Sequence, residues 1–178
     1  MEQYQHTPLP ENRFIRVLNL LPPPSTNSSE LHGKLIPVSL DKLPPFEALS
    51  YSWGAPVLSS TIICDGHALN ITSNCEAALR RLRQPAKARL VWVDAICIDQ
   101  TSVAERNQQV KYMGEIYGQA RRVLVWLGES TERSEVALRG FRRVYDGALT
   151  GRLFGVRMRE RVVEMEIARL KGGQPISV

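Results

Sequence analysis

Two nearly continuous apolar runs, separated by an amphipathic stretch, constrain the fold of this chain more than any other feature. The runs cover residues 89–98 and 123–127, and apolar side chains recur at helical spacing between residues 104 and 120. Apolar runs of this kind are typical of strands buried on both faces of a sheet. The order strand, helix, strand predicts a βαβ unit with parallel strands and a right-handed crossover. The helical positions predicted to face the core are Val110, Met113, Ile116, Tyr117 and Ala120.

Shorter strands are expected earlier in the chain, over residues 14–20, 31–40 and 46–51. Prolines stand between them at positions 22–24 and 44–45. Because proline cannot donate to a strand ladder, the first two strands are predicted to be edge or accessory elements. Asp65-Gly66 lies between the apolar runs 62–64 and 68–71, which predicts a small hairpin with a tight turn.

Helix signals follow the hairpin. Ser73 to Glu76 has the spacing of a capping box, with Ser73 as the expected cap, and the apolar stripe behind it predicts a helix that ends before Pro85. Two further amphipathic helices are expected after residue 128, the last of them ending at Gly172-Gly173. Their apolar positions are Ala137, Phe141, Val144 and Tyr145, then Met158, Val162, Met165 and Ile167.

Composition narrows the class of protein. The chain has 178 residues and a net charge of +5, which fits one globular domain with its own core. The basic residues are spread along the chain, a pattern that favours solvated helix faces over nucleic-acid binding. The sequence contains no apolar stretch long enough for a membrane-spanning helix and no secretory signal pattern. We therefore expect a soluble, cytoplasmic protein.

Most chemical motifs are absent. The sequence contains no GxxxxGK[ST] or GxGxxG phosphate loop, no GxSxG elbow and no HExxH zinc motif. Cys64, Cys75 and Cys97 form no CxxC pair, so they are interpreted as reduced, buried thiols, without a disulfide framework or a zinc site. Cys64 and His67 straddle the predicted turn without a second ligand pair, and no metal site is expected.

Two polar clusters remain as candidate sites for ligand binding or an interface. Both follow predicted strands, and ligands in open α/β sheets bind outside the carboxyl ends of strands. Asp99 and Ser102 have a second interpretation as helix caps, and Asp94 as an acceptor for loop amides. The first cluster comprises Ser50, Tyr51, Trp53 and Gly54, and the second comprises Asp94, Cys97, Asp99, Gln100, Glu105 and Gln109.

Several blocks of residues, in the right order and with matching spacing, carry a resemblance to a known family. They are Phe46-Glu47-Ala48-Leu49-Ser50-Tyr51-Ser52-Trp53-Gly54, Val91-Trp92-Val93-Asp94-Ala95-Ile96-Cys97-Ile98-Asp99-Gln100, Glu105-Arg106 with Gln109-Val110, and Val123-Leu124-Val125-Trp126-Leu127-Gly128. Over residues 46–145 the chain resembles the heterokaryon-incompatibility (HET) domain of filamentous fungi. The resemblance implies a role in non-self recognition, in which such proteins trigger growth arrest or programmed cell death after hyphae fuse.

HET domains resemble TIR domains, which have a flavodoxin-like sheet, associate with one another and in some branches cleave NAD. The resemblance therefore implies an α/β fold: a flavodoxin-like or TIR-like parallel sheet flanked by helices, with accessory N-terminal β-strands and a small β-hairpin. It also implies a catalytic glutamate after the third parallel strand, where the chain has Glu135 and Glu129 as weak candidates. NAD is then a possible substrate, with Trp53 able to stack on one of its rings.

The expected organisation is an N-terminal proline-rich lead-in over residues 1–45, a HET domain over 46–150 and a C-terminal helix and tail over 151–178, interpreted as truncated. Three hypotheses stay open at this point. The first is a signalling module that acts through self-association and through other incompatibility proteins. The second is a TIR-like NAD hydrolase, and the third is an inactive remnant.

Overall fold

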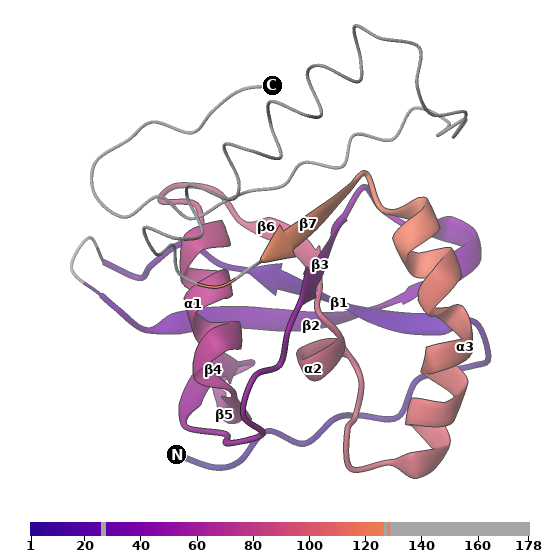
Figure 1. The fold of residues 1–178 in the computed structure, drawn as a ribbon, viewed down its shortest axis with the longest axis horizontal. Helices are drawn as coiled ribbons and strands as arrows, with labels where there is room; N and C mark the ends of the chain where they lie inside the picture. The colour runs from indigo at the N-terminus through magenta and orange to yellow at the C-terminus, as the bar shows by residue number, and fades with distance from the viewer. Residues whose placement is uncertain (26–27, 127, 129–178) are drawn as a thin grey trace, which may run out of the picture.

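A single seven-stranded sheet organises the part of the chain that the computed structural model describes, residues 1–25, 28–126 and 128 (Figure 1). The strands lie in the order β5-β4-β2-β1-β6-β3-β7. Their bounds are β1 Phe14–Leu20, β2 Leu31–Ser39, β3 Glu47–Tyr51, β4 Ser60–Cys64, β5 His67–Ile71, β6 Arg89–Trp92 and β7 Arg122–Trp126. The helices are η1 Leu40–Lys42, α1 Ser73–Leu82, α2 Asp94–Cys97 and α3 Val103–Gln119.

The sheet is mixed, and this corrects the prediction of a parallel sheet. Strand β3 pairs in parallel with both β6 and β7, so these three strands form a parallel unit. The first of them along the chain, β3, lies between the other two. Strand β1 then pairs antiparallel with both β6 and β2, which makes the sheet as a whole a mixed α/β arrangement. The predicted βαβ unit has parallel strands β6 and β7, with β3 between them.

The N-terminal strands are wrongly predicted as edge or accessory elements. Strand β1 lies fourth of seven, between β2 and β6, and its register with β2 runs without a break from Phe14 to Leu20. The triple proline follows β1 and does not interrupt it. Pro37 lies inside β2, where β2 pairs only with β1, because its pairing with β4 covers only residues 31–33. Proline is tolerated there since one side of the strand needs no donor.

The hairpin prediction is confirmed, and the helix that follows begins one residue earlier than expected. Asp65 and Gly66 both have positive φ, 49° and 84°, and join the antiparallel strands β4 and β5. Both central residues of a type I′ turn need that conformation. The cap of α1 is Thr72 rather than Ser73, and the Thr72 hydroxyl accepts a hydrogen bond from the Cys75 amide at 3.2 Å.

The apolar run 89–98 is a strand only in its first half. Strand β6 ends at Trp92, and residues 94–97 form the single turn α2 before α3 begins at Val103. The hydroxyl of Ser102 caps α3 by accepting the Glu105 amide at 3.2 Å. Ile116 and Ala120 are buried as predicted, whereas Val110 is 59% exposed, so its predicted core position is wrong.

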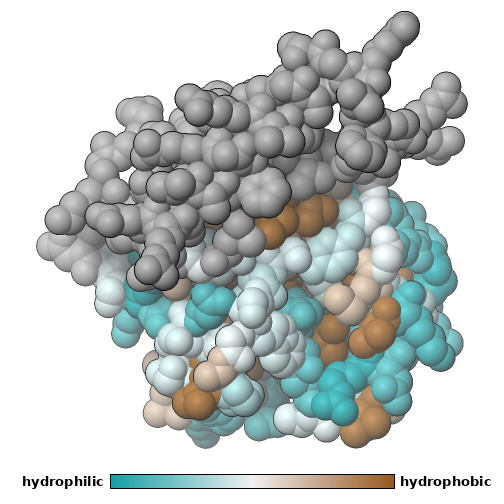
Figure 2. Space-filling view, in the orientation of Figure 1, coloured by the Kyte–Doolittle hydropathy of each residue, from teal (hydrophilic) through white to brown (hydrophobic). Residues whose placement is uncertain are grey.

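The core lies on both sides of β1, β3 and β6, and it includes Trp92. All three cysteines are also part of the core, as free thiols. Burial raises the pKa of each of these thiols to about 12, which keeps them protonated at neutral pH. On the face seen in Figure 2, hydrophilic and intermediate side chains surround several separate apolar patches. Within the described residues, no helix is long and apolar enough to cross a membrane.

Candidate functional site

The carboxyl ends of β3 and β6 bring one member of each predicted cluster together. Trp53 follows β3 and Asp94 follows β6, and the indole Nε1 of Trp53 donates a hydrogen bond to Oδ2 of Asp94 at 3.0 Å. Because β3 and β6 are parallel neighbours, both side chains leave the sheet at the same edge. This is the edge at which ligands bind in open α/β sheets.

Asp94 is the first residue of α2, and its carboxyl group is held by the local backbone. Its Oδ1 accepts the Ala95 amide at 2.7 Å, and its backbone carbonyl accepts Nε2 of Gln100 at 2.9 Å. Burial raises the pKa of the Asp94 carboxyl, against the opposing effect of the hydrogen bonds from Ala95 and Trp53. The carboxyl group is therefore more readily protonated than an ordinary aspartate.

Two tyrosines line the same edge. Tyr117 of α3 donates its hydroxyl to the backbone carbonyl of Leu49 at 3.1 Å and lies beside the Ser50 hydroxyl. Burial, then the charge of Asp94, raises the pKa of Tyr117 to about 12. Burial likewise raises the pKa of Tyr51, whose hydroxyl adjoins the Cys75 thiol without hydrogen-bond geometry to any described residue. We call Ser50, Tyr51, Trp53, Asp94 and Tyr117 the carboxyl-end cluster.

Asn74 connects this edge to α1 and β7. Its amide nitrogen donates to the carbonyl of Ser52 at 2.5 Å, and its amide oxygen accepts Nε1 of Trp126 at 2.8 Å. One side chain at the start of α1 thus joins the ends of two neighbouring parallel strands. Beyond Ser52 the chain turns through Gly54, whose φ of 68° suits glycine, into an exposed apolar loop.

The remaining candidates of the second cluster make contacts within the fold. Glu105 forms an ion pair with the buried Arg16, with Oε1 2.5 Å from Nη1, and the same carboxylate oxygen accepts the Asp99 amide at 2.8 Å. Gln109 is buried and donates to the carbonyl of Phe14 at 2.9 Å, and the Cys97 thiol is buried beside Val93. Asp99 accepts the amide and hydroxyl of Thr101. The structure does not bring these four side chains to Trp53.

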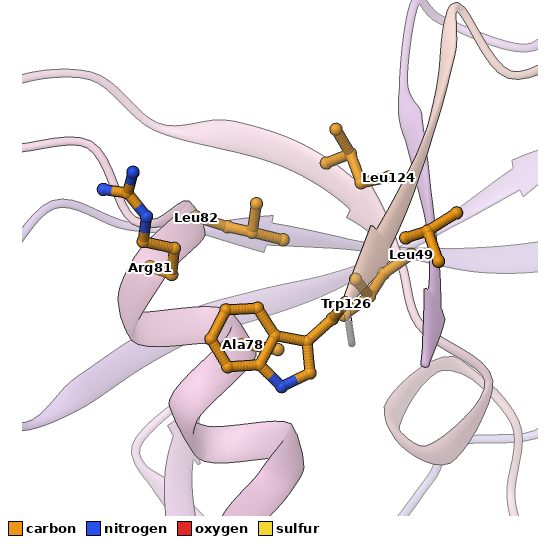
Figure 3. Close-up of a pocket in the computed structure, with 7 residues that line it drawn as sticks. Leu49, Ala78, Arg81, Leu82, Leu124 and Trp126 are labelled. Carbon is orange, nitrogen blue, oxygen red and sulfur yellow. The ribbon is translucent and has the colours of Figure 1, made fainter. Parts of the chain in front are cut away.

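A small apolar hollow lies next to the cluster, between α1 and strands β3 and β7. Figure 3 shows Trp126 of β7 beside Ala78 of α1, with Leu49 and Leu124 from the two strands. The catalytic candidates Glu129 and Glu135 lie outside the described residues. Among the residues that the structure describes, no group of three His, Cys, Asp or Glu side chains could hold a metal ion.

The chemistry available at the carboxyl-end cluster is that of one carboxylate in an aromatic surrounding. Asp94 can accept hydrogen bonds or a proton, and the tyrosine hydroxyls stay protonated at neutral pH, where they donate or accept hydrogen bonds without carrying a charge. The indole of Trp53 is 40% exposed and offers a flat apolar face beside the carboxylate. The arrangement suits recognition of a group that combines a flat ring or apolar surface with a hydrogen-bond donor.

Two members of the site were not predicted from the sequence. Tyr117 was assigned to the core stripe of its helix, and Asn74 was assigned only to a capping pattern. Both assignments are compatible with the structure, since Tyr117 packs against the core and Asn74 lies in the first turn of α1. Only their hydrogen bonds, from Tyr117 to the carbonyl of Leu49 and between Asn74 and both Ser52 and Trp126, show that these side chains also contact the strands of the site.

Comparison with known proteins supports the family resemblance that the sequence blocks indicate. The family model for the heterokaryon incompatibility protein (HET) matches residues 46–154, which include β3 to β7 and every residue of the carboxyl-end cluster. Heterokaryon incompatibility protein 6, OR allele, of Neurospora crassa is 34% identical over 133 residues. That alignment covers 67% of this chain and 19% of the relative's length. No solved structure matches. The chain belongs to the heterokaryon incompatibility (HET) family.

Proposed function

We propose that this chain is a signalling module of fungal non-self recognition, which triggers growth arrest and programmed cell death from the cytoplasm through self-association. The observation that carries the proposal is the hydrogen bond between Trp53 and Asp94. It joins two separate blocks of the family match at the ligand-binding edge of a parallel unit. Neither side chain is needed to complete the core, because Trp53 is 40% exposed and Asp94 carries an ionisable carboxyl group whose pKa is raised by burial.

The loop that follows Trp53 supports self-association. Val57 and Leu58 are 62% and 60% exposed, and they lie five residues or fewer from the indole that contacts Asp94. Exposed apolar side chains next to a polar site are typical of protein interaction surfaces. A second copy of the chain, or another incompatibility protein, would cover this loop and the exposed face of Trp53 together.

A matched pair of variants tests the role of the loop. Val103 and Val110 on α3 are each 59% exposed, close to the exposure of Val57 and Leu58. We expect Val57→Ser with Leu58→Ser to reduce concentration-dependent assembly in light scattering and to weaken growth arrest when the protein is expressed in hyphae. Val103→Ser with Val110→Ser should leave both unchanged. Equal assembly of the two double variants would contradict the proposal that the loop with Val57 and Leu58 is the self-association surface.

A TIR-like NAD hydrolase is the second candidate function. It is favoured by the parallel unit β6-β3-β7, with its first strand in the middle, and by a carboxylate beside an exposed indole at the carboxyl ends. Cleavage of a glycosidic bond needs a carboxylate near the sugar. The test is incubation of concentrated protein with NAD and chromatography of nicotinamide and ADP-ribose, with Glu135→Ala, Glu129→Ala and Asp94→Asn in parallel. Product release that one variant abolishes would support the enzyme, and no release from assembled protein would exclude it.

A further inference from the structure

Residues 2–7 run across the described fold as a separate segment, which we call the N-terminal strap. At its start, the Tyr4 amide donates to the carbonyl of Ala68 at 2.8 Å, and the Ala68 amide donates to the carbonyl of Glu2 at 2.9 Å. The strap therefore pairs with β5 at the edge of the sheet, and the ring of Tyr4 packs against the core. Figure 1 shows the segment continuing from β5 past α2 toward α3.

Helix α2, which carries Asp94 as its first residue, is a single turn of four residues. A turn of this length is not stable alone, since helix nucleation is unfavourable and its carbonyl groups lack partners within the helix. Its N-cap, Val93, supplies no side-chain hydrogen bond. Contacts from other parts of the chain must hold it in place.

The strap and β1 supply those contacts. His6 of the strap places Nε2 2.9 Å from the carbonyl oxygen of Ile96, and because a carbonyl only accepts, this nitrogen carries the hydrogen. Arg16 of β1 donates through Nη1 to the carbonyl of Cys97 at 3.2 Å and through Nη2 to the carbonyl of Thr7 at 2.6 Å. One buried guanidinium group thus ties the end of the strap to the end of α2.

We propose that the N-terminal strap is a positioning element. It holds α2, and through it the Asp94 carboxylate, within hydrogen-bonding distance of Trp53. Residues 2–7 lie outside the segment that the family model matches, so this role is carried by their contacts alone. When the strap detaches from Ile96, the turn loosens and the bond from Trp53 to Asp94 is lost. The strap thereby acts as a clamp on the candidate site. Its positioning of α2 is independent of the proposed function, and only its expected effect on growth arrest rests on that function.

The test measures the full chain with His6→Ala, with His6→Gln as the conservative variant that keeps a side-chain N–H donor. Arg13→Ala is the control, because Arg13 also precedes β1 but forms its ion pairs with Asp41 of η1 and Glu115 of α3 rather than with α2. Two readouts report on the site. Hydrogen exchange follows the amides of Cys97 and Ile98, and acrylamide quenching follows Trp53, since Trp92 and Trp126 are buried.

We expect His6→Ala to speed exchange of these amides roughly fivefold, as the loss of one hydrogen bond would, and to increase quenching. Amides in the middle of α3 should exchange as before, which shows that the fold is intact. His6→Gln should restore much of the protection, and Arg13→Ala should change neither readout. Unchanged exchange and quenching in His6→Ala would overturn the proposal. If the strap variants loosen α2 but growth arrest persists, the clamp stands and the proposed function of the site fails.

Discussion

The indole nitrogen of Trp53 donates to the carboxylate of Asp94 across 3.0 Å, although 41 positions separate the two residues in the chain. Each side chain lies just beyond one of two neighbouring parallel strands, β3 and β6. The pair defines the candidate site because its two members serve the core little and face the edge of the sheet where ligands bind.

The coupling between these residues can be measured with a double-mutant cycle. Trp53→Phe keeps an aromatic ring but removes the N–H donor, and Asp94→Asn keeps an acceptor oxygen but removes the charge. We expect a coupling free energy of about 1 kcal/mol from urea denaturation of the two single variants and the double variant. Strictly additive losses would show that the charge of Asp94 adds nothing to this bond in solution.

The ionisation of Asp94 predicts how stability depends on pH. Burial raises the pKa of Asp94 in the folded protein above its ordinary value of 3.8, so the folded state holds this proton more tightly than the unfolded state. The contribution of Asp94 to the free energy of unfolding therefore falls as the pH rises from 3.8 through the raised pKa of the folded protein. Asp94→Asn removes the titration, and the variant should gain stability relative to the parent protein between acidic and neutral pH. A relative loss over that range would contradict the raised pKa.

Glu105 should show the opposite pH dependence. Burial alone would raise its pKa, but hydrogen bonds from Arg16 and from the Asp99 amide hold the pKa below its ordinary value. Its contribution to stability is present at neutral pH and is lost as the pH falls through the folded pKa. Glu105→Gln leaves the buried Arg16 guanidinium without a counter-charge, and we expect a loss of about 3 kcal/mol at pH 7 in denaturant unfolding.

The pair formed by Arg13 and Glu115, which is much more exposed than the pair of Arg16 and Glu105, provides the comparison for that result. Glu115→Gln should cost less than about 1 kcal/mol, because exposed ion pairs contribute little. Equal losses from Glu105→Gln and Glu115→Gln would show that the pair between Arg16 and Glu105 is not a buried structural contact.

Trp92 supplies a prediction about the core. Its indole is fully buried, makes an edge contact with the ring of Tyr117 at 5.5 Å, and has no hydrogen-bond partner for Nε1 among the described residues. Trp92→Ala should destabilise the protein by about 3–5 kcal/mol because it leaves a large cavity. Trp92→Phe should cost only about 1–2 kcal/mol, since no hydrogen bond is lost. Similar losses for the two variants in thermal unfolding would contradict this account.

Local sequence signals predicted the elements better than their places in the sheet. The turn at Asp65-Gly66 and the amphipathic stretch of α3 are determined by neighbouring residues, and both were predicted from the sequence. The position of β1 in the sheet was not predicted correctly. The prolines around it indicate where strands end, but they do not indicate which strands pair. The apolar run 89–98 was interpreted as one strand since periodicity alone does not separate a buried strand from a short buried helix.

The candidate site shows the same division. Trp53 and Asp94 were predicted as members of two clusters, since each follows a strand, but their contact depends on the parallel register of β3 and β6. Glu105 and Gln109 have polar side chains at the start of a helix, and their partners, the Arg16 side chain and the Phe14 carbonyl, lie about ninety residues away in the sequence. The contact of His6 with Ile96 spans a similar distance, and no local pattern indicates it.

The central claim is that the Trp53–Asp94 pair is the functional site of this HET domain, and growth arrest on expression in fungal hyphae tests it most directly. Asp94→Asn is compared with Asp65→Asn, the same chemical change in the hairpin turn, where Asn-Gly is as well suited as Asp-Gly. At matched protein abundance, we expect Asp94→Asn to abolish growth arrest and Asp65→Asn to retain it. Growth arrest by the Asp94→Asn protein at the level of the parent would contradict the claim.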